Sequence, residues 1–313
     1  MSRQFPNARP RLEYSAELAN AEPEEKFAPV GPAIADLMAE HGVAGYPIGV
    51  YTWEVGAILS LQEAGLRVLD ATPLVEAAGT VKTEDEVAIY RTIGRQYEHT
   101  VKAFRGAIRP GVSEKELARV VVAAWSDADG EDISQLNVCS GENMNPWRRW
   151  PTDRPLQAGD LVGIDLHARG VDGLRGDVSR TFLVGEQFTS EQRDLYRRAY
   201  DYMHETAACI RAGRTFGEVM DTMPRVPARY QTLLDNYQIF HGVGMWAAES
   251  PKLIRKAPKR DEVLKPNQVL AVESYFGEEG GALAVKLELP VLVREDGLEL
   301  IGGGMPFDER LLA

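Results

Sequence analysis

The stretch LVGIDLHARGVDGLRGDVSRTF, residues 161–182, carries the strongest fold information in this chain. An apolar run ends at Asp165, a glycine-rich segment follows, and Asp177 precedes a second apolar run that starts at Phe182. Two apolar runs separated by glycines predict a β-hairpin, here with one aspartate on each arm. Two neighbouring carboxylates repel each other and lose hydration unless they share a proton or a cation. The hairpin therefore suggests a metal site, provided that the rest of the chain supplies further ligands.

The composition is that of a globular protein of moderate size. The chain has 313 residues and a formal net charge of -12, enough length for one large domain and a smaller one. An acidic chain offers no basic face to nucleic acid and no attraction to an anionic membrane. Cys139 and Cys209 are its two cysteines, too few for a disulfide framework or a thiolate zinc site. With no signal-peptide core or membrane-length apolar run, we expect a cytoplasmic protein.

The order of apolar runs and breakers predicts three parts. Residues 1–26 are polar and contain prolines, which predicts an N-terminal arm. Residues 27–81 alternate short helix and strand candidates, which predicts a small accessory α/β domain. Residues 82–313 hold the larger domain, which opens with a long amphipathic helix over 83–107.

Two segments of the larger domain resemble each other. IRPGVSEKEL (108–117) and IRAGRTFGEV (210–219) align without a gap, and each follows a predicted long helix. Both contain the S/T-x-x-E pattern of a capping box. Coincidence is one explanation, because a helix that ends in glycine before a capped helix is common, but duplication is the preferred interpretation. A duplication would instead produce two similar halves with a site in the cleft between them.

Four carboxylates and one histidine interrupt apolar or glycine-rich runs of this domain. Each alone has an ordinary structural explanation, such as a solvent-facing side chain or a turn. Together they suit two divalent cations, because four negative charges balance four positive ones. An oxygen-rich set with one imidazole favours Mn, Fe or Co, with Zn possible, and such ions acidify a bound water and polarise a carbonyl. The five residues are Asp165, Asp177, His241, Glu273 and Glu288.

This order of Asp, Asp, His, Glu and Glu resembles that of the pita-bread metallopeptidases, which include methionine aminopeptidase, prolidase and aminopeptidase P. The resemblance covers about residues 82–301 and includes the aspartate hairpin, HGVGM, AVES and KLELPVLVREDG. It implies an α/β (α+β) pita-bread fold of two pseudo-symmetric halves, preceded by a shortened creatinase-like domain. It also implies two metal ions on those five ligands, a homodimer, and Glu273 as the acceptor of a proton from water.

The aspartate hairpin departs from the peptidase pattern. Asp165 and Asp177 lie one residue further apart than is usual in the family, and His167 follows where a small residue is typical. His167 either adds a metal ligand or caps the turn, and the turn is the preferred interpretation.

Two helper histidines of the peptidases are also replaced. Ala248 stands at one of these positions, although Glu249, a candidate catalytic residue, keeps the surrounding pattern, and Arg148 stands at the other. Losing such an oxyanion donor typically costs about two to three orders of magnitude in rate, which argues against ordinary peptidase chemistry. The segment WRRW (147–150) could instead bind a substrate, with Arg148 on a carboxylate and aromatic faces on a cation or ring. A surface or packing cluster is the alternative.

Three functions follow from these features. The leading one is a dinuclear metal-dependent hydrolase of an amide or C–N bond in a dipeptide-like (Xaa-Pro type) or small-molecule substrate. The long hairpin, NPW (145–147) and the Glu-Ser pair at 273–274 also resemble the dimethylsulfoniopropionate lyases. That branch implies proton abstraction and β-elimination on the same scaffold. The third is a non-catalytic pita-bread binding protein.

Overall fold

The computed structural model describes residues 27–230, 238–246 and 248–313. The chain divides into two compact units, Met1–Ala78 and Gly79–Ala313. The boundary falls close to the predicted one at residue 82. The predicted N-terminal arm, residues 1–26, lies outside the described residues.

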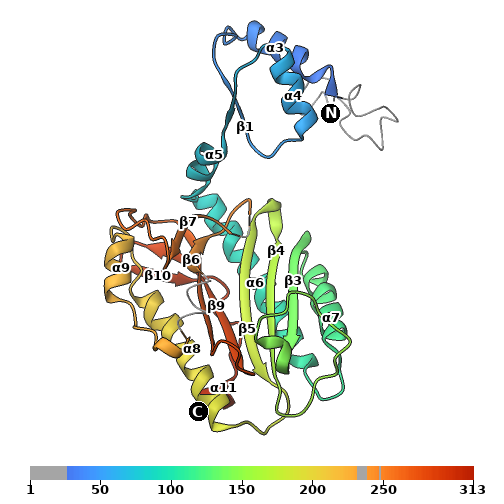
Figure 1. The fold of residues 1–313 in the computed structure, drawn as a ribbon, viewed down its shortest axis with the longest axis vertical. Helices are drawn as coiled ribbons and strands as arrows, with labels where there is room; N and C mark the ends of the chain where they lie inside the picture. The colour runs from blue at the N-terminus through green and yellow to red at the C-terminus, as the bar shows by residue number, and fades with distance from the viewer. Residues whose placement is uncertain (1–26, 231–237, 247) are drawn as a thin grey trace. The chain divides into compact units, whose positions relative to one another are not determined.

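The first unit contains short helices and a small parallel sheet (Figure 1). Ser60 joins two of the helices, because its hydroxyl accepts a hydrogen bond from the Gly31 amide at 2.9 Å. Glycine is needed there, since a Cβ at Gly31 would lie 2.0 Å from the Ser60 carbonyl oxygen. In order, the elements are α3 (Val30–Glu40), β1 (Ile48–Val50), α4 (Val55–Glu63), β2 (Val68–Asp70) and α5 (Thr72–Gly79), with β1 parallel to β2.

The first half of the second unit places two helices beside a three-stranded antiparallel sheet of order β3-β4-β5. The predicted long helix is confirmed and begins after Thr83, which forms a capping box with Glu86. The predicted hairpin is confirmed as β4 and β5. The elements are α6 (Glu84–Ala107), α7 (Glu114–Asp127), β3 (Asp132–Ser140), η1 (Gly141–Met144), β4 (Leu161–Arg169), η2 (Val171–Gly173) and β5 (Arg175–Leu183).

The second half builds a five-stranded sheet of order β10-β9-β8-β6-β7. Helix α8 packs on β8 and β9, as α6 packs on β5 in the first half. The elements are α8 (Ser190–Ala208), α9 (Phe216–Thr222), β6 (Gln238–Gly242), β7 (Glu249–Ile254), β8 (Val269–Gly277), β9 (Ala284–Arg294), β10 (Gly297–Leu300) and α11 (Glu309–Leu312).

The two similar segments occupy equivalent places in the two halves. Ser113 and Thr215 each cap a helix through a capping box, at the starts of α7 and α9. The preceding glycines make matching backbone hydrogen bonds of 2.9 Å, from Gly111 to the Leu156 carbonyl and from Gly213 to the Leu264 carbonyl. This correspondence in three dimensions supports duplication over coincidence.

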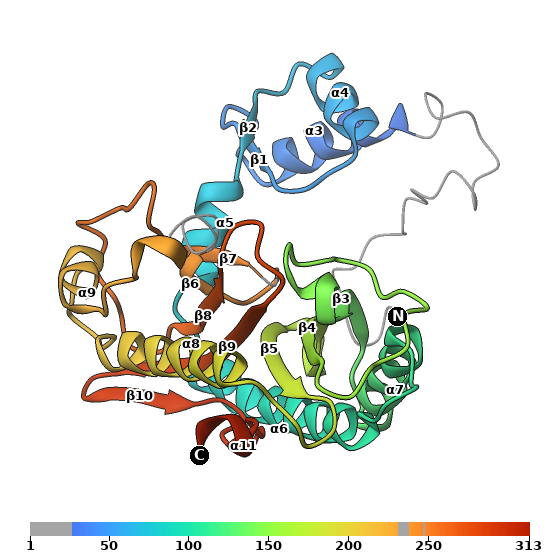
Figure 2. The same cartoon turned by 60° about the horizontal axis from the view of Figure 1, so that its bottom comes forward.

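The two sheets meet where β5 lies beside β9 (Figure 2). Thr181 on β5 joins them, because its hydroxyl donates to the Lys286 carbonyl at 2.8 Å and accepts from the Lys286 amide at 3.2 Å. Each half keeps its own buried apolar cluster, one centred on α6, α7 and β3–β5 and the other on α8 and the C-terminal strands. The strands that carry the predicted ligands are therefore anchored to each other at this junction.

Candidate metal centre

The structure brings all five predicted ligands together in the second unit. Each comes from a different strand, and each is buried, with no more than 6% of its surface exposed. Glu273 and Glu288 are direct partners in the β8–β9 register, so their side chains share one face of the sheet. The carriers are Asp165 on β4, Asp177 on β5, His241 on β6, Glu273 on β8 and Glu288 on β9.

His241 lies among three of the carboxylates. Its Nε2 is 3.3 Å from Glu273 Oε1, 3.5 Å from Glu288 Oε1 and 3.5 Å from Asp177 Oδ2. Its Nδ1 lies 3.0 Å from the Gly242 carbonyl oxygen, which selects the tautomer that leaves Nε2 free to bind a metal. Atoms that coordinate one ion at about 2.1 Å stand roughly 3 to 3.5 Å apart, so the observed spacing fits a shared cation.

Several carboxylate oxygens of this cluster make no hydrogen bond to the described residues. Asp177 Oδ1 and both carboxylate oxygens of Glu288 are buried without a hydrogen bond to the described residues. Burial raises the pKa of Asp177 well above its usual value, and repulsion from Glu288 and Asp165 adds to the rise. Buried oxygens without partners are costly, and a cation removes that cost. The residues present therefore fit a divalent metal.

The imidazole of His241 responds to the same carboxylates. Burial lowers its pKa, whereas the nearby carboxylates of Glu273 and Glu288 raise it, and the net result is a pKa of about 10. In the metal-free chain a proton on His241 thus partly offsets the negative charge. A metal that binds Nε2 must displace this proton, which makes metal binding pH-dependent.

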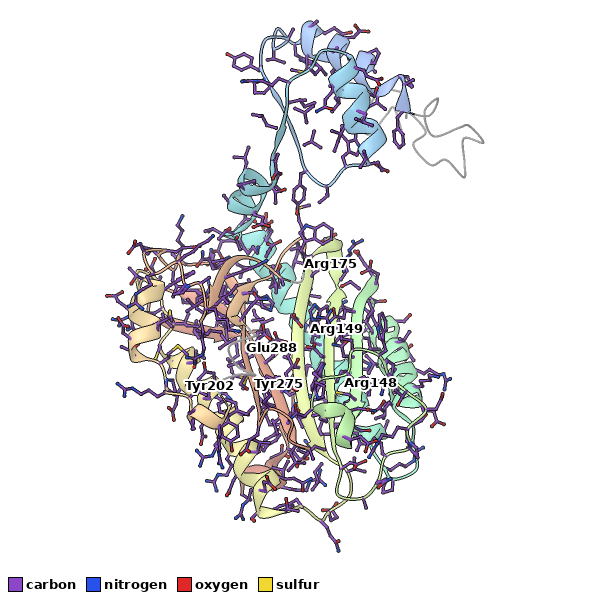
Figure 3. All side chains as sticks on the ribbon, in the orientation of Figure 1. Arg148, Arg149, Arg175, Tyr202, Tyr275 and Glu288 are labelled. Carbon is purple, nitrogen blue, oxygen red and sulfur yellow. The ribbon has the colours of Figure 1, made fainter. Side chains whose placement is uncertain are left out.

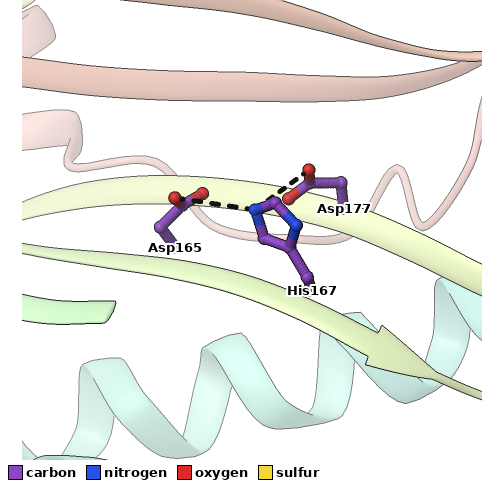
Figure 4. Close-up of side chains that lie close together, drawn as sticks. All are labelled: Asp165, His167 and Asp177. Atoms are coloured by element: carbon purple, nitrogen blue, oxygen red, sulfur yellow. Dashed lines mark ion pairs between the residues drawn. The ribbon is translucent and has the colours of Figure 1, made fainter. Parts of the chain in front are cut away.

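His167 lies within strand β4 beside the candidate metal ligands, and not in the turn. Strand β4 continues to Arg169, so alternation places His167 on the same face as Asp165 and directly opposite Asp177 in register. His167 Nε2 is 3.2 Å from Asp177 Oδ2 and 3.7 Å from Asp165 Oδ2 (Figure 4). The turn interpretation was wrong because both strands extend beyond the apolar runs that marked them.

Two overlapping sets of ligand atoms can each hold a metal ion. Asp165, His167 and Asp177 form one set, and Asp177, His241 and Glu288 form the other, with the candidate ligand atoms of each set within 4.8 Å of one another. Asp177 belongs to both, as a bridging carboxylate would.

Sequence reasoning missed Lys286, a buried cation inside the cluster. Its Nζ lies 2.8 Å from both Asp165 Oδ1 and Ser179 Oγ, and 3.5 Å from Glu273 Oε2. Burial lowers the pKa of Lys286, but the carboxylates, led by Asp165, outweigh burial and raise it well above its usual value. Strand alternation could have revealed Lys286, because it lies two residues before Glu288 and therefore faces the same side.

The ligands open into a cavity of about 430 Å³ within the second unit. Four of the five predicted ligands line it, together with His167 and Lys286; Glu288 is not among the lining residues described. The other walls are mostly polar or aromatic. They are formed by Gln135, Asn137, Trp147, Arg149, Gln238 and Ala248.

Two predicted catalytic residues are placed elsewhere. Glu249 Oε1 is 3.4 Å from Lys82 Nζ in a buried ion pair, and its Oε2 accepts a hydrogen bond from the Trp246 amide at 3.2 Å. Arg148 is exposed, and its backbone amide and guanidinium both donate to Asn143, at 3.0 Å and 3.3 Å. These bonds turn Arg148 back toward η1, whereas its neighbour Arg149 lines the cavity. Both arginines come from the loop that precedes β4 (Figure 3).

Comparison with known proteins identifies the family to which the chain belongs. Residues 88–295 match the model of metallopeptidase family M24. The chain belongs to this family. Among the described helices, none combines the length and apolar character needed to cross a membrane.

The M24 chain is similar to several curated proteins. It is 26% identical over 289 residues to dimethylsulfoniopropionate lyase DddP of Roseovarius nubinhibens, which covers 89% of this chain and 64% of that protein. It is 25% identical over 199 residues to methionine aminopeptidase 1 of Bacillus subtilis, over 61% of this chain and 79% of that protein. The chain spans a little under two thirds of the length of the lyase relatives.

Several solved structures share the fold. Xaa-Pro dipeptidase from Bacillus anthracis superposes with a TM-score of 0.75 at 23% identity, covering 88% of this chain and 77% of that one. Dipeptidase PepE from Mycobacterium ulcerans gives 0.72 at 18% identity, covering 92% and 74%. The predicted pita-bread fold is confirmed.

Proposed function

We propose that this M24 chain is a dinuclear metal-dependent hydrolase of an amide or C–N bond in a dipeptide-like or small-molecule substrate. The observation that carries the proposal is the pair of metal-binding sets that share Asp177 and line a cavity of about 430 Å³. Lys286 changes the charge balance expected from the sequence. Four carboxylates and one ammonium leave three negative charges, so two divalent ions leave one positive charge for an anionic ligand to neutralise.

The chain's own residues take distinct roles in this proposal. Asp165, Asp177, His241, Glu273 and Glu288, with His167 as a further ligand, would hold two ions of Mn, Fe, Co or Zn, which supply an activated water and polarise a carbonyl. Glu273 faces the cavity and would accept a proton from that water. Arg149 would bind the substrate carboxylate in place of the predicted Arg148, because Arg149 lines the cavity.

Metal analysis and a substrate panel test the hydrolase. Purified protein is expected to contain two metals per chain and to cleave Xaa-Pro or non-prolyl dipeptides, with one oxygen from labelled water in the product. Glu273→Gln should lower kcat by about two orders of magnitude or more, because a proton acceptor typically contributes that much. No bound metal, and no cleavage after adding Mn, Fe, Co or Zn, would refute the proposal.

A second candidate is a metal-dependent lyase on the same site. It is favoured because the match to the dimethylsulfoniopropionate lyases spans 289 residues, and because Ala248, where peptidases carry a helper histidine, lines the cavity. Release of dimethyl sulfide from dimethylsulfoniopropionate, without oxygen from labelled water in the products, would favour this candidate. Metal binding without turnover of either substrate class would favour a binding protein.

We also propose a homodimer, as the family resemblance implies, and a cytoplasmic location, as expected from the sequence. Light scattering on the full chain tests the assembly, and a monomer at micromolar concentration would contradict it.

A further inference from the structure

Carboxamide side chains from both sheets line the metal cavity. Gln135 and Asn137 lie two residues apart on β3 and share one face, where they pair in register with His167 and Asp165. Gln238 begins β6 in the other sheet and lines the same cavity. Ligand pockets are usually lined mainly by apolar and aromatic residues, with a few polar groups that fix orientation. Three carboxamides beside the ligands therefore indicate recognition of polar groups.

Asn137 presents an unpaired hydrogen-bond acceptor. Its side chain is 2% exposed, and its Nδ2 donates to Asp165 Oδ2 at 3.2 Å. An ionised carboxylate only accepts hydrogen bonds, so the amide nitrogen must face Asp165 and the carbonyl oxygen must face away from it. Asn137 Oδ1 is buried and makes no hydrogen bond within the described part of the chain. Such a group costs about 1 to 3 kcal/mol unless a partner arrives, and the cavity is where a partner can bind.

Gln238 and Trp147 each add a buried polar atom that makes no hydrogen bond to the described residues. Gln238 Oε1 is an acceptor and Trp147 Nε1 a donor, and neither has a hydrogen-bond partner among the residues described. Trp147 is held in place by close packing over β4, where a Cβ at Gly163 would lie 2.5 Å from Trp147 Cη2. The cavity thus has acceptors at Asn137 and Gln238, and donors at Trp147 and the guanidinium of Arg149.

We propose that Asn137 is a specificity-determining residue that recognises an amino or hydroxyl group of a small carboxylic acid. Asn137 Oδ1, assisted by Gln238 Oε1, accepts a hydrogen bond from that group, and Arg149 and Trp147 Nε1 donate to the carboxylate. The substrate class is therefore a small dipeptide-like amide that carries both a free carboxylate and an amino or hydroxyl group. This inference rests on the proposed function, because it places the substrate beside the metal ligands.

Calorimetry on the metal-loaded full chain tests the recognition. The probes are propionate, its 3-amino and 3-hydroxy derivatives, and the 2-amino and 2-hydroxy isomers, so that the donor occupies either carbon. The wild-type protein should bind the donor-bearing acid of at least one isomer series about 5- to 150-fold more tightly than propionate, which corresponds to about 1 to 3 kcal/mol. β-Alanine betaine, a zwitterion whose quaternary ammonium has no hydrogen-bond donor, should bind no more tightly than propionate.

Variants assign the preference to one atom. Asn137→Leu keeps a similar branched shape without the polar atoms and should reduce the preference to less than about threefold, while propionate affinity changes little. Gln238→Leu, in the other sheet, should reduce the preference by a smaller factor. Gln135→Leu, in the same cavity, should reduce the preference less than Asn137→Leu does, because the Gln135 amide nitrogen faces His167 at 3.3 Å.

Metal content, measured on every protein, separates the possible failures. Absence of metal from the wild-type chain refutes the proposed function itself. A metal-loaded wild-type chain that binds propionate as tightly as its derivatives, or binds none of them, refutes only this inference. So does an Asn137→Leu variant that keeps the preference. Equal binding of β-alanine and its betaine would show that charge, not hydrogen-bond donation, is recognised.

Discussion

Asp177→Asn is the sharpest test of the metal centre, because it acts in opposite directions on the metal-free and the metal-loaded protein. In the metal-free chain, burial and two neighbouring carboxylates raise the pKa of Asp177 well above 3.8. A raised folded-state pKa favours folding below the unfolded-state pKa, and this contribution is lost as pH rises through the folded-state value. Asparagine carries no charge, so the metal-free variant should be at least as stable as wild type at pH 8.

When metal is present, Asp177→Asn should instead lower the stability of the protein relative to wild type. Removing one partner of a buried charged pair costs about 3 to 5 kcal/mol, which corresponds to a loss of roughly two to three and a half orders of magnitude in metal affinity. At a free metal concentration of about 100 times the wild-type Kd, binding stabilises wild type by about 2.7 kcal/mol. For a unit of this size that is a rise in Tm of about 5 to 11 °C. A variant weakened about 100-fold gains only about 0.4 kcal/mol, or some 1 to 2 °C.

Thermal unfolding with and without metal measures both effects, and elemental analysis gives the stoichiometry. Asp153→Asn is a matched control, because its carboxylate is 84% exposed and pairs with Lys115 on the surface. The control should keep the wild-type rise in Tm. If Asp177→Asn keeps two metals per chain and the full rise, Asp177 is not a bridging ligand and the site must be reassigned.

Three further predictions concern stability and the loop of residues 140–152, which carries Trp147 and Arg149. Arg91 holds the pKa of Glu299 at about 2, so Glu299→Gln should cost up to about 1 kcal/mol at pH 7. In urea unfolding this cost should shrink as pH falls below 4.5; a constant cost would refute the assignment. Glu114 accepts hydrogen bonds from both ends of loop 140–152, so Glu114→Gln should cost about 1 to 3 kcal/mol. It should also raise KM more than it lowers kcat, and an unchanged KM would contradict its positioning role. Thr83→Ala should cost about 1 kcal/mol through loss of the α6 cap, and an unchanged urea midpoint would contradict the capping box.

The ligands were predictable from sequence because local patterns carry them. Asp165, Glu273 and Glu288 interrupt apolar strand runs, where a charged side chain needs a partner. Glycines and apolar runs marked the hairpin of β4 and β5, and an S/T-x-x-E pattern marked two capped helices. Each of these features depends on residues close together in the chain, and short-range periodicity therefore sufficed.

The environment of the ligands was less predictable. His167 was assigned to the turn because the apolar run ended before it, but pairing with β5 extends β4 to Arg169. Lys286 resembled a solvent-facing strand lysine until the junction of β5 and β9 placed it 2.8 Å from Asp165. Pairing between distant strands decides both positions.

By itself the sequence predicted five candidate metal ligands in a specific order, and the pita-bread fold that this order resembles. Only the tertiary structure decided that Lys286 shares the cluster, that Arg149 and not Arg148 lines the cavity, and that Asn137 offers an unpaired acceptor there. The physical reason is that strand periodicity specifies which face a side chain occupies. It does not specify which face of another strand, a hundred residues away, packs against it.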